Sequence, residues 1–141
     1  MIDTHSHIIP GIDDGAKDDD MAVRMLKIAE DSGTKKLIVT PHFMRGRFDY
    51  EYNEVTEEVE KLRKLAVDND INIEIYQGQE VYYSDRIVKY YDREIIGTIN
   101  GTRYMLIELP MLEFNLDEII DNLYELQLKG VTPIIAHPER Y

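Results

Sequence analysis

The sequence predicts an α/β fold with mainly parallel strands, of which we expect about five. Three observations indicate this class. Strand-like apolar runs alternate with helix-like periods, the alternation repeats along the whole chain, and all four histidines fall at or just after the ends of predicted strands. Neighbouring parallel strands are usually joined by a helix, so this alternation is their expected pattern. We assign residues 1–141 to one domain, a length sufficient for a hydrophobic core.

The predicted strands are short runs that are rich in β-branched residues or alternate between apolar and polar side chains. Pro41, Gly78, Pro110 and Pro138 follow four of these runs and are typical of strand ends. The strands are expected at residues 1–3, 36–40, 71–76, 104–109 and 132–136.

The predicted helices are four segments with apolar residues at helical spacing. Asp18 to Asp20 offer N-cap side chains for the first, which runs to about Ser32. The second covers about 51–69, a short third begins at Ser84, and a long fourth follows Pro110. The apolar faces are Met21, Met25, Ile28 and Ala29; Val55, Val59, Leu62 and Ala66; Ile87, Val88 and Tyr91; and Leu116, Ile119, Ile120, Leu123 and Leu126, the last set facing inward.

The composition limits the classes of function. The net charge of −12 disfavours nucleic acid and anionic membranes and suits divalent cations or a basic partner. No apolar run approaches the roughly 20 residues that span a bilayer, and the start lacks a signal-peptide pattern, so we expect a cytoplasmic protein without a membrane span. The absence of cysteine excludes disulfides and a cysteine nucleophile, which leaves nitrogen and oxygen ligands for any metal.

Histidines and carboxylates collect where strands are predicted to end. His5 and His7 follow the first strand as a His-x-His pair, whose two-residue spacing turns both imidazoles to one face. Ligands gather at the C-terminal ends of strands in parallel α/β folds, so we expect one shared site. The other candidates at strand ends are His42, Glu80, Glu108 and His137.

The acidic stretch after the first strand divides into two parts. Asp14 lies in a turn shaped by Pro10, Gly11 and Gly15, from which it can reach the site. A calcium EF-hand loop is a poor match, because the acidic residues lack that loop's alternate spacing and its final glutamate. Asp18 to Asp20 are better explained as helix caps.

A mixed set of histidine and carboxylate ligands suits manganese, iron or zinc, and magnesium less well. Bridging carboxylates let two or three metals share a pocket, and such clusters suit hydrolysis of phosphate esters by a metal-bound hydroxide. Arg140, three residues after His137, is placed to hold a phosphate through its bidentate guanidinium.

Five motifs together resemble one known superfamily. The segments "DTHSHIIPGIDDG", "TPHF", "GQEVY", "IELP" and "AHPERY" look like the polymerase-and-histidinol-phosphatase (PHP) superfamily, and most of all its bacterial branch of manganese-dependent protein-tyrosine phosphatases encoded with capsule and exopolysaccharide genes. The motifs run from residue 3 to residue 141. Glu108 favours this branch over histidinol phosphatase, because many relatives in the superfamily have a histidine there.

The resemblance implies a distorted β/α barrel, similar to a TIM barrel, with up to three Mn²⁺ ions. Glu80 would bridge two of them, and Arg140 and His42 would serve catalysis, with Arg140 on the substrate phosphate. The implied substrate is a phosphotyrosine protein, typically the tail of a bacterial tyrosine kinase. The implied metal ligands are His5, His7, Asp14, His42, Glu80, Glu108 and His137.

One departure from the family leaves alternatives open. Members carry a later aspartate and histidine that complete the site, and these lie beyond Tyr141, so we expect the chain to be the N-terminal part of a larger barrel. An open sheet edge would then favour association, and a homo-oligomer is left open. Alternatives to the tyrosine phosphatase are another PHP phosphoesterase, such as a histidinol-phosphatase-like enzyme, and a truncated, non-catalytic metal-binding module.

Overall fold

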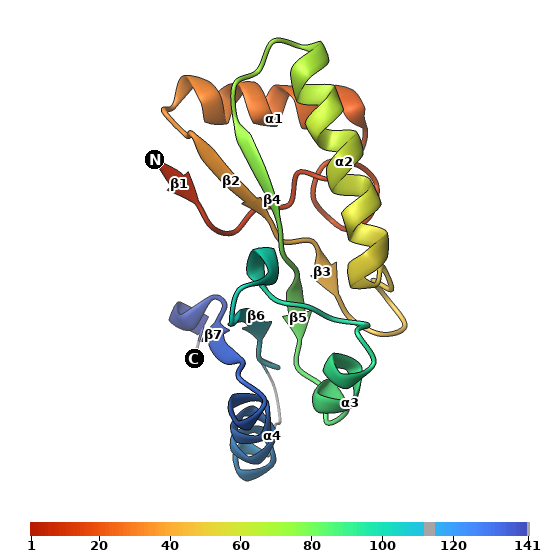
Figure 1. The fold of residues 1–141 in the computed structure, drawn as a ribbon, viewed down its shortest axis with the longest axis vertical. Helices are drawn as coiled ribbons and strands as arrows, with labels where there is room; N and C mark the ends of the chain where they lie inside the picture. The colour runs from red at the N-terminus through yellow and green to blue at the C-terminus, as the bar shows by residue number, and fades with distance from the viewer. Residues whose placement is uncertain (112–114, 141) are drawn as a thin grey trace.

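In the described part of the chain, seven strands form two parallel sheets, one above the other (Figure 1). A computed structural model describes residues 1–111 and 115–140, without the side chain of Arg140. The first sheet has the order β1-β2-β4 and the second the order β3-β5-β6-β7, and every strand pairing is parallel. The strands are β1 (Ile2–Asp3), β2 (Lys36–Val39), β3 (His42–Phe43), β4 (Glu74–Gln77), β5 (Glu80–Tyr82), β6 (Tyr104–Glu108) and β7 (Thr132–Ile135). The predicted α/β class with mainly parallel strands is confirmed.

Two of the five predicted strands each continue into the second sheet as a further strand. Pro41 lacks an N–H and separates β2, in the strand predicted at residues 36–40, from β3. The Pro41 carbonyl accepts a 2.9 Å hydrogen bond from the Glu80 N–H. Gly78 and Gln79 separate β4 from β5. The prediction that Gly78 ends its strand was therefore incomplete, because the chain resumes as a strand at Glu80. These two interruptions make His42 and Glu80 neighbours at the start of the second sheet.

The helices agree with the sequence pattern in type and approximate extent. Asp18 caps the first by accepting a 2.8 Å hydrogen bond from the Met21 N–H, as predicted. The third begins later than predicted, because the Ser84 hydroxyl accepts from the Arg86 N–H in a turn and caps no helix. The elements are α1 (Asp19–Asp31), α2 (Tyr52–Asp68), α3 (Ile87–Asp92), α4 (Leu116–Leu128) and the 3₁₀ turns η1 (Ile99–Gly101) and η2 (Pro138–Arg140). None of the helices in the described ranges has the length and apolar character needed to cross a membrane.

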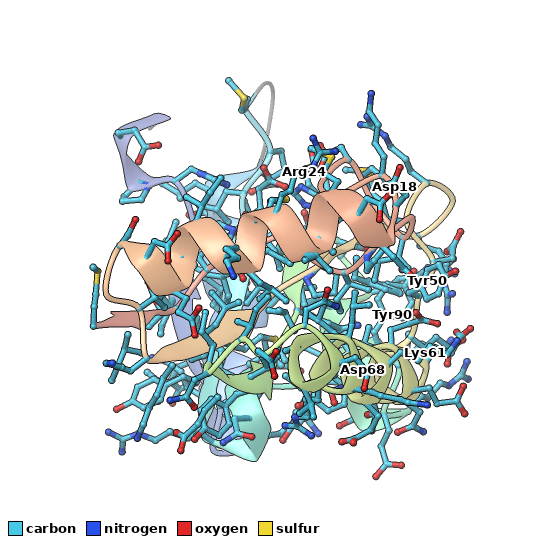
Figure 2. All side chains as sticks on the ribbon, turned by 90° about the horizontal axis from the view of Figure 1, so that it is seen from above. Asp18, Arg24, Tyr50, Lys61, Asp68 and Tyr90 are labelled. Atoms are coloured by element: carbon cyan, nitrogen blue, oxygen red, sulfur yellow. The ribbon has the colours of Figure 1, made fainter. Side chains whose placement is uncertain are left out.

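Each sheet has its own hydrophobic core. In the first, α1 and α2 lie over the strands, and Figure 2 shows α1 crossing above them with Asp18 at its start. The predicted face of α2 is fully buried, with Val55, Val59, Leu62 and Ala66 at most 2% exposed. Burying each Val or Leu side chain contributes roughly 1.5–3 kcal/mol.

Two predicted faces differ from the structure. On α1 the buried positions are Ala22 and Leu26, while Ile28 lines a cavity and is 66% exposed. On α4 the expectation that Leu116 and Ile120 face inward was wrong, since they are 57% and 53% exposed. The helix packs through other positions, and no described element covers its outer side. Periodicity identifies an apolar face, but only the neighbouring elements decide how much of it is buried.

Candidate metal centre

The candidate site is organised around one buried carboxylate, Glu80, at the start of β5. Its side chain is 0% exposed. The Oε1 atom lies 3.2 Å from His5 Nε2, 3.2 Å from His7 Nε2 and 3.0 Å from His42 Nδ1. The Oε2 atom lies 2.8 Å from His137 Nε2. All four histidines of the chain therefore converge on a single glutamate, as the predicted strand ends suggested.

These contacts lack the geometry of hydrogen bonds. Within the described residues, neither Glu80 oxygen has a hydrogen-bond partner, although both are buried. The Nε2 atoms of His5 and His7 also face each other at 3.1 Å. A buried carboxylate without partners is costly, so such an arrangement calls for a missing positive charge. Adjacent ligands on an octahedral ion with bonds of about 2.1 Å are about 3 Å apart, which matches these separations.

Three overlapping groups of side chains have the spacing of metal ligands. In each group the potential ligand atoms all lie within 4.8 Å of one another. Because His7, His42 and Glu80 each belong to two groups, the groups form one cluster that could hold more than one ion. The groups are His7, Asp13, Asp14 and His42; His5, His7 and Glu80; and His42, Glu80 and Glu108.

The loop after β1 is held firmly against β2, and this fixes the His-x-His pair. The Ser6 N–H donates to Thr40 Oγ1 at 3.1 Å, and the Thr40 N–H donates to the Ser6 carbonyl at 2.8 Å. Gly15 lies directly against His7, because a Cβ atom added there would come within 2.1 Å of the His7 carbonyl oxygen. Only glycine permits this close approach. The predicted role of Gly15 in shaping the turn thus extends to seating His7.

Asp13 is a site residue that the sequence reasoning missed. Its side chain is 1% exposed, and its Oδ2 lies 2.9 Å from His7 Nδ1 and accepts from the His42 N–H at 3.0 Å. The neighbouring Asp14 is 63% exposed and reaches His42 Nε2 at 3.2 Å. Asp13 therefore orients the imidazole of His7 from behind, as carboxylates beside ligand histidines commonly do. The pair of adjacent aspartates in "PGIDDG" was the available signal, and it did not distinguish the two roles.

The charged groups of the cluster shift one another's pKa values. Burial alone raises the pKa of Glu80, but the imidazoles of His5, His7 and His42 outweigh it and hold that pKa far below its usual range. Burial lowers the pKa of His7, yet its contacts with Asp13 and Glu80 raise it to about 9. Burial likewise raises the pKa of Asp13, while bonds from His7 and two backbone N–H groups lower it overall. The raised pKa of His7 favours its protonated form, which places a positive charge beside Glu80.

The remaining predicted residues come from the last strands. Glu108 ends β6, and its Oε1 lies 3.9 Å from His42 Nδ1. His137 follows β7 with a φ of 50°, a left-handed conformation that costs a residue with a side chain about 1–3 kcal/mol and is found at functional sites. The backbone of Arg140 lies in η2, and its side chain lies outside the described part of the chain. The structure thus brings the seven predicted ligands into one region, and the phosphate-binding role of Arg140 stays a prediction.

A cavity of about 1050 Å³ opens over the cluster. Volumes of this order accommodate small-molecule or peptide side-chain ligands. Met25 and Ile28 of α1 line one side, while Met44 and Phe48 after β3 line another. The fold and the site therefore define a parallel α/β protein with a histidine–carboxylate centre suited to several metal ions, open to a ligand.

Comparison with known proteins gives the family. The family described as "Capsular polysaccharide synthesis, CpsB/CapC" matches residues 1–141, and the chain belongs to it. The chain is 36% identical over 141 residues to tyrosine-protein phosphatase YwqE of Bacillus subtilis, covering 99% of this chain and 55% of YwqE. It is 34% identical to the putative tyrosine-protein phosphatase CapC of Staphylococcus aureus, covering 99% of this chain and 54% of CapC. It is 32% identical to tyrosine-protein phosphatase CpsB of Streptococcus pneumoniae, covering 100% of this chain and 58% of CpsB.

A solved structure supports the same assignment. It is described as belonging to YwqE from Bacillus subtilis and CpsB from Streptococcus pneumoniae, "unique metal-dependent tyrosine phosphatases". It matches this chain with a TM-score of 0.93 at 36% identity, covering 99% of this chain and 56% of that one. The chain spans slightly more than half the length of these relatives. The resemblance to the capsule-associated phosphatase branch is thereby confirmed at the level of the family and the fold.

Proposed function

We propose that this chain supplies the metal centre of a metal-dependent phosphotyrosine-protein phosphatase, a phosphoric monoester hydrolase linked to capsular polysaccharide synthesis. The observation that carries the proposal is the convergence of four histidines on the buried Glu80, whose oxygens have no hydrogen-bond partner among the described residues. The names of the relatives supply the substrate class, since they are described as tyrosine-protein phosphatases. Mn²⁺ is the proposed metal, with iron, zinc or magnesium as alternatives.

The donor set fits the proposed ions. Bound divalent ions would supply Lewis-acid activation of water and neutralisation of the phosphoryl charge. Glu80 provides a buried negative charge that faces ligands on several sides, and Asp13 holds His7 in one orientation. Arg140 is proposed to bind the substrate phosphate, and His42 to contact both metal and substrate. The proposed ligands are His5, His7, Asp14, His42, Glu80, Glu108 and His137.

The substrate and the assembly of the protein extend this proposal. The proposed substrate is the phosphorylated tail of a bacterial tyrosine kinase, acted on in the cytoplasm. A homo-oligomer is also proposed, because β7 lies at the edge of its sheet and Ile134 on it is 40% exposed. Light scattering of the purified chain at several concentrations tests this directly. A monomer at every concentration would contradict it.

Metal-dependent hydrolysis of p-nitrophenyl phosphate tests the activity. The chain with Mn²⁺ should release p-nitrophenol, and His5→Ala or His42→Ala should each lower kcat/KM at least about 100-fold. Lys61→Ala, on the exposed side of α2, is the matched control and should change nothing. Equal rates in the wild type and both histidine variants would overturn the proposal.

Two further measurements separate the alternatives. A phosphotyrosine peptide should be cleaved faster than histidinol phosphate, and the reverse order would favour another phosphoesterase of the superfamily. Elemental analysis should give more than one metal ion per chain. A chain that binds metal but hydrolyses neither substrate would instead be a non-catalytic metal-binding module.

A further inference from the structure

The turn after β3 is built to hold one aromatic side chain beside the metal centre. The Met44 N–H donates to the Phe48 carbonyl at 3.0 Å, and the Phe48 N–H donates to the Met44 carbonyl at 2.8 Å. Gly46 supplies the positive φ of 91° at the tip, and its N–H donates to Asp49 Oδ1 at 3.0 Å. The turn is therefore closed by its own backbone, and it fixes where Phe48 lies.

Phe48 extends a stack of rings from the ligands to the cavity wall. The rings of His7 and His42 are stacked with centroids 4.4 Å apart and planes 23° apart. Phe48 continues from His42 at 5.4 Å and 20°. Phe48 is half-buried and lines the cavity over the metal centre. An aromatic ring thus lines the cavity wall where the proposed ligands end.

Arg47 places a positive charge at the mouth of the same cavity. Its guanidinium carbon lies 4.9 Å from the centroid of the Phe48 ring. Neighbouring Arg45 is paired with Asp49 at 3.4 Å, whereas Arg47 makes no ion pair within 4.0 Å among the described residues. On a chain of net charge −12, an unpaired cation at the mouth locally offsets the repulsion of an anionic ligand.

We propose that Phe48 forms an aryl subsite that selects a phosphate carried on a phenyl ring over one carried on an alkyl group, and that Arg47 attracts either phosphate toward it. The inference rests on the proposed function, because it takes the phosphate to be held at the metal centre. The phenyl ring then lies on the wall that begins at Phe48, and Arg47 attracts the dianion without discriminating between the two groups. Aromatic contact of this kind is worth up to about tenfold in binding.

Binding of two phosphonates to the Mn²⁺-loaded chain, measured by calorimetry, tests the subsite without turnover. The wild type should bind phenylphosphonate about tenfold more tightly than methylphosphonate. Phe48→Leu should reduce this preference to about threefold or less, while methylphosphonate affinity stays unchanged, and Phe48→Tyr should retain the preference. Arg47→Gln should weaken both ligands by a similar factor and reduce the dependence of their affinity on salt. Arg45→Gln is the matched control and should alter neither ligand.

Metal content is measured for each variant, because Phe48 contacts His42. A metal-loaded Phe48→Leu variant with an unchanged preference would overturn the inference, as would a wild type that binds phenylphosphonate no better than methylphosphonate. If Arg47→Gln bound both phosphonates as tightly as the wild type, the proposed role of Arg47 in attracting the anion would be overturned. A wild type that shows the Phe48-dependent preference but hydrolyses no aryl phosphate would uphold the subsite and overturn the proposed function alone.

Discussion

Gly15→Ala is expected to remove metal binding by displacing His7 without changing any ligand. The new Cβ would lie 2.1 Å from the His7 carbonyl oxygen and 2.6 Å from its Cβ, whereas ordinary contacts are about 3.4 Å or longer. The His7 backbone must therefore move by about 1.3 Å, which strains the 3.1 Å hydrogen bond from the Ala16 N–H to the His7 carbonyl. Metal ligands tolerate errors of only about 0.2 Å, so the site should lose His7 as a ligand.

The expected cost combines two effects. Overpacking of this size costs typically about 1–3 kcal/mol, and a lost hydrogen bond adds about 1 kcal/mol. We therefore expect the free energy of unfolding to fall by about 2–4 kcal/mol. Thermal unfolding with and without Mn²⁺ is the assay. The wild-type Tm should rise with metal concentration, as binding to the folded state requires, and the Gly15→Ala Tm should be lower and insensitive to metal.

Gly130→Ala separates the local clash from a general glycine effect. Gly130 has a φ of 89° and nothing within 4 Å of an added Cβ, so only backbone strain of about 1–2 kcal/mol is expected there. This control should lower the Tm with and without Mn²⁺ by the same amount. A Gly15→Ala variant that kept the full metal-dependent rise in Tm would refute the argument that Gly15 seats a ligand.

Three further predictions follow from the same site and core. Glu80→Gln should lower the number of metal ions bound per chain in elemental analysis, because the central negative charge facing four imidazoles is lost. The control Glu74→Gln, at an exposed strand position, should leave the number of bound metal ions unchanged. Apparent metal affinity in calorimetric titrations should rise about tenfold per pH unit from pH 6.5 to 8.5, since the pKa of about 9 keeps His7 protonated and only its neutral form binds metal. Leu62→Ala should lower the free energy of unfolding in urea titrations by about 2–5 kcal/mol, because Leu62 is only 1% exposed.

Each of these has an outcome that contradicts it. Unchanged metal content in Glu80→Gln would mean that the carboxylate is no ligand. A flat pH dependence of affinity would show that His7 stays outside the coordination shell, and titrations in two buffers should otherwise reveal proton release on binding. A loss of less than about 1 kcal/mol in Leu62→Ala would mean that the α2 face packs less tightly than its burial indicates.

The fold class could be predicted because local patterns determine it. The alternation of strand and helix signals, the Asp18 cap and the buried stripe of α2 are properties of short windows, and the structure confirms them. The interruption at Gly78 and Gln79 could not be predicted as two strands, because it depends on how neighbouring strands bend together. The exposure of Leu116 on α4 likewise depends on which elements lie beside the helix, and periodicity does not contain that information.

The site could be predicted as a set, but its internal roles could not. Histidines at strand ends indicated one shared pocket, and all four do meet at Glu80. The same pattern could not show that Glu80 is the buried centre. Nor could it show that Asp13, one residue before the predicted Asp14, supports His7. Such roles follow from atomic distances and burial, which the order of residue types does not specify.

The approach of His5, which follows β1, to His137, which follows β7, has a consequence for the kinetics of folding. The rings of His5 and His137 lie 5.1 Å apart, so residues from nearly opposite ends of the described chain must be brought together before the centre is complete. Closing a loop this long costs conformational entropy, and parallel sheets that depend on such closures fold slowly. His137 joins the other six candidate ligands only after β7 has docked, so its contribution to metal binding is coupled to that step of folding. A chain in which β7 had not docked would lack only His137 and would still hold all three groups of candidate ligands.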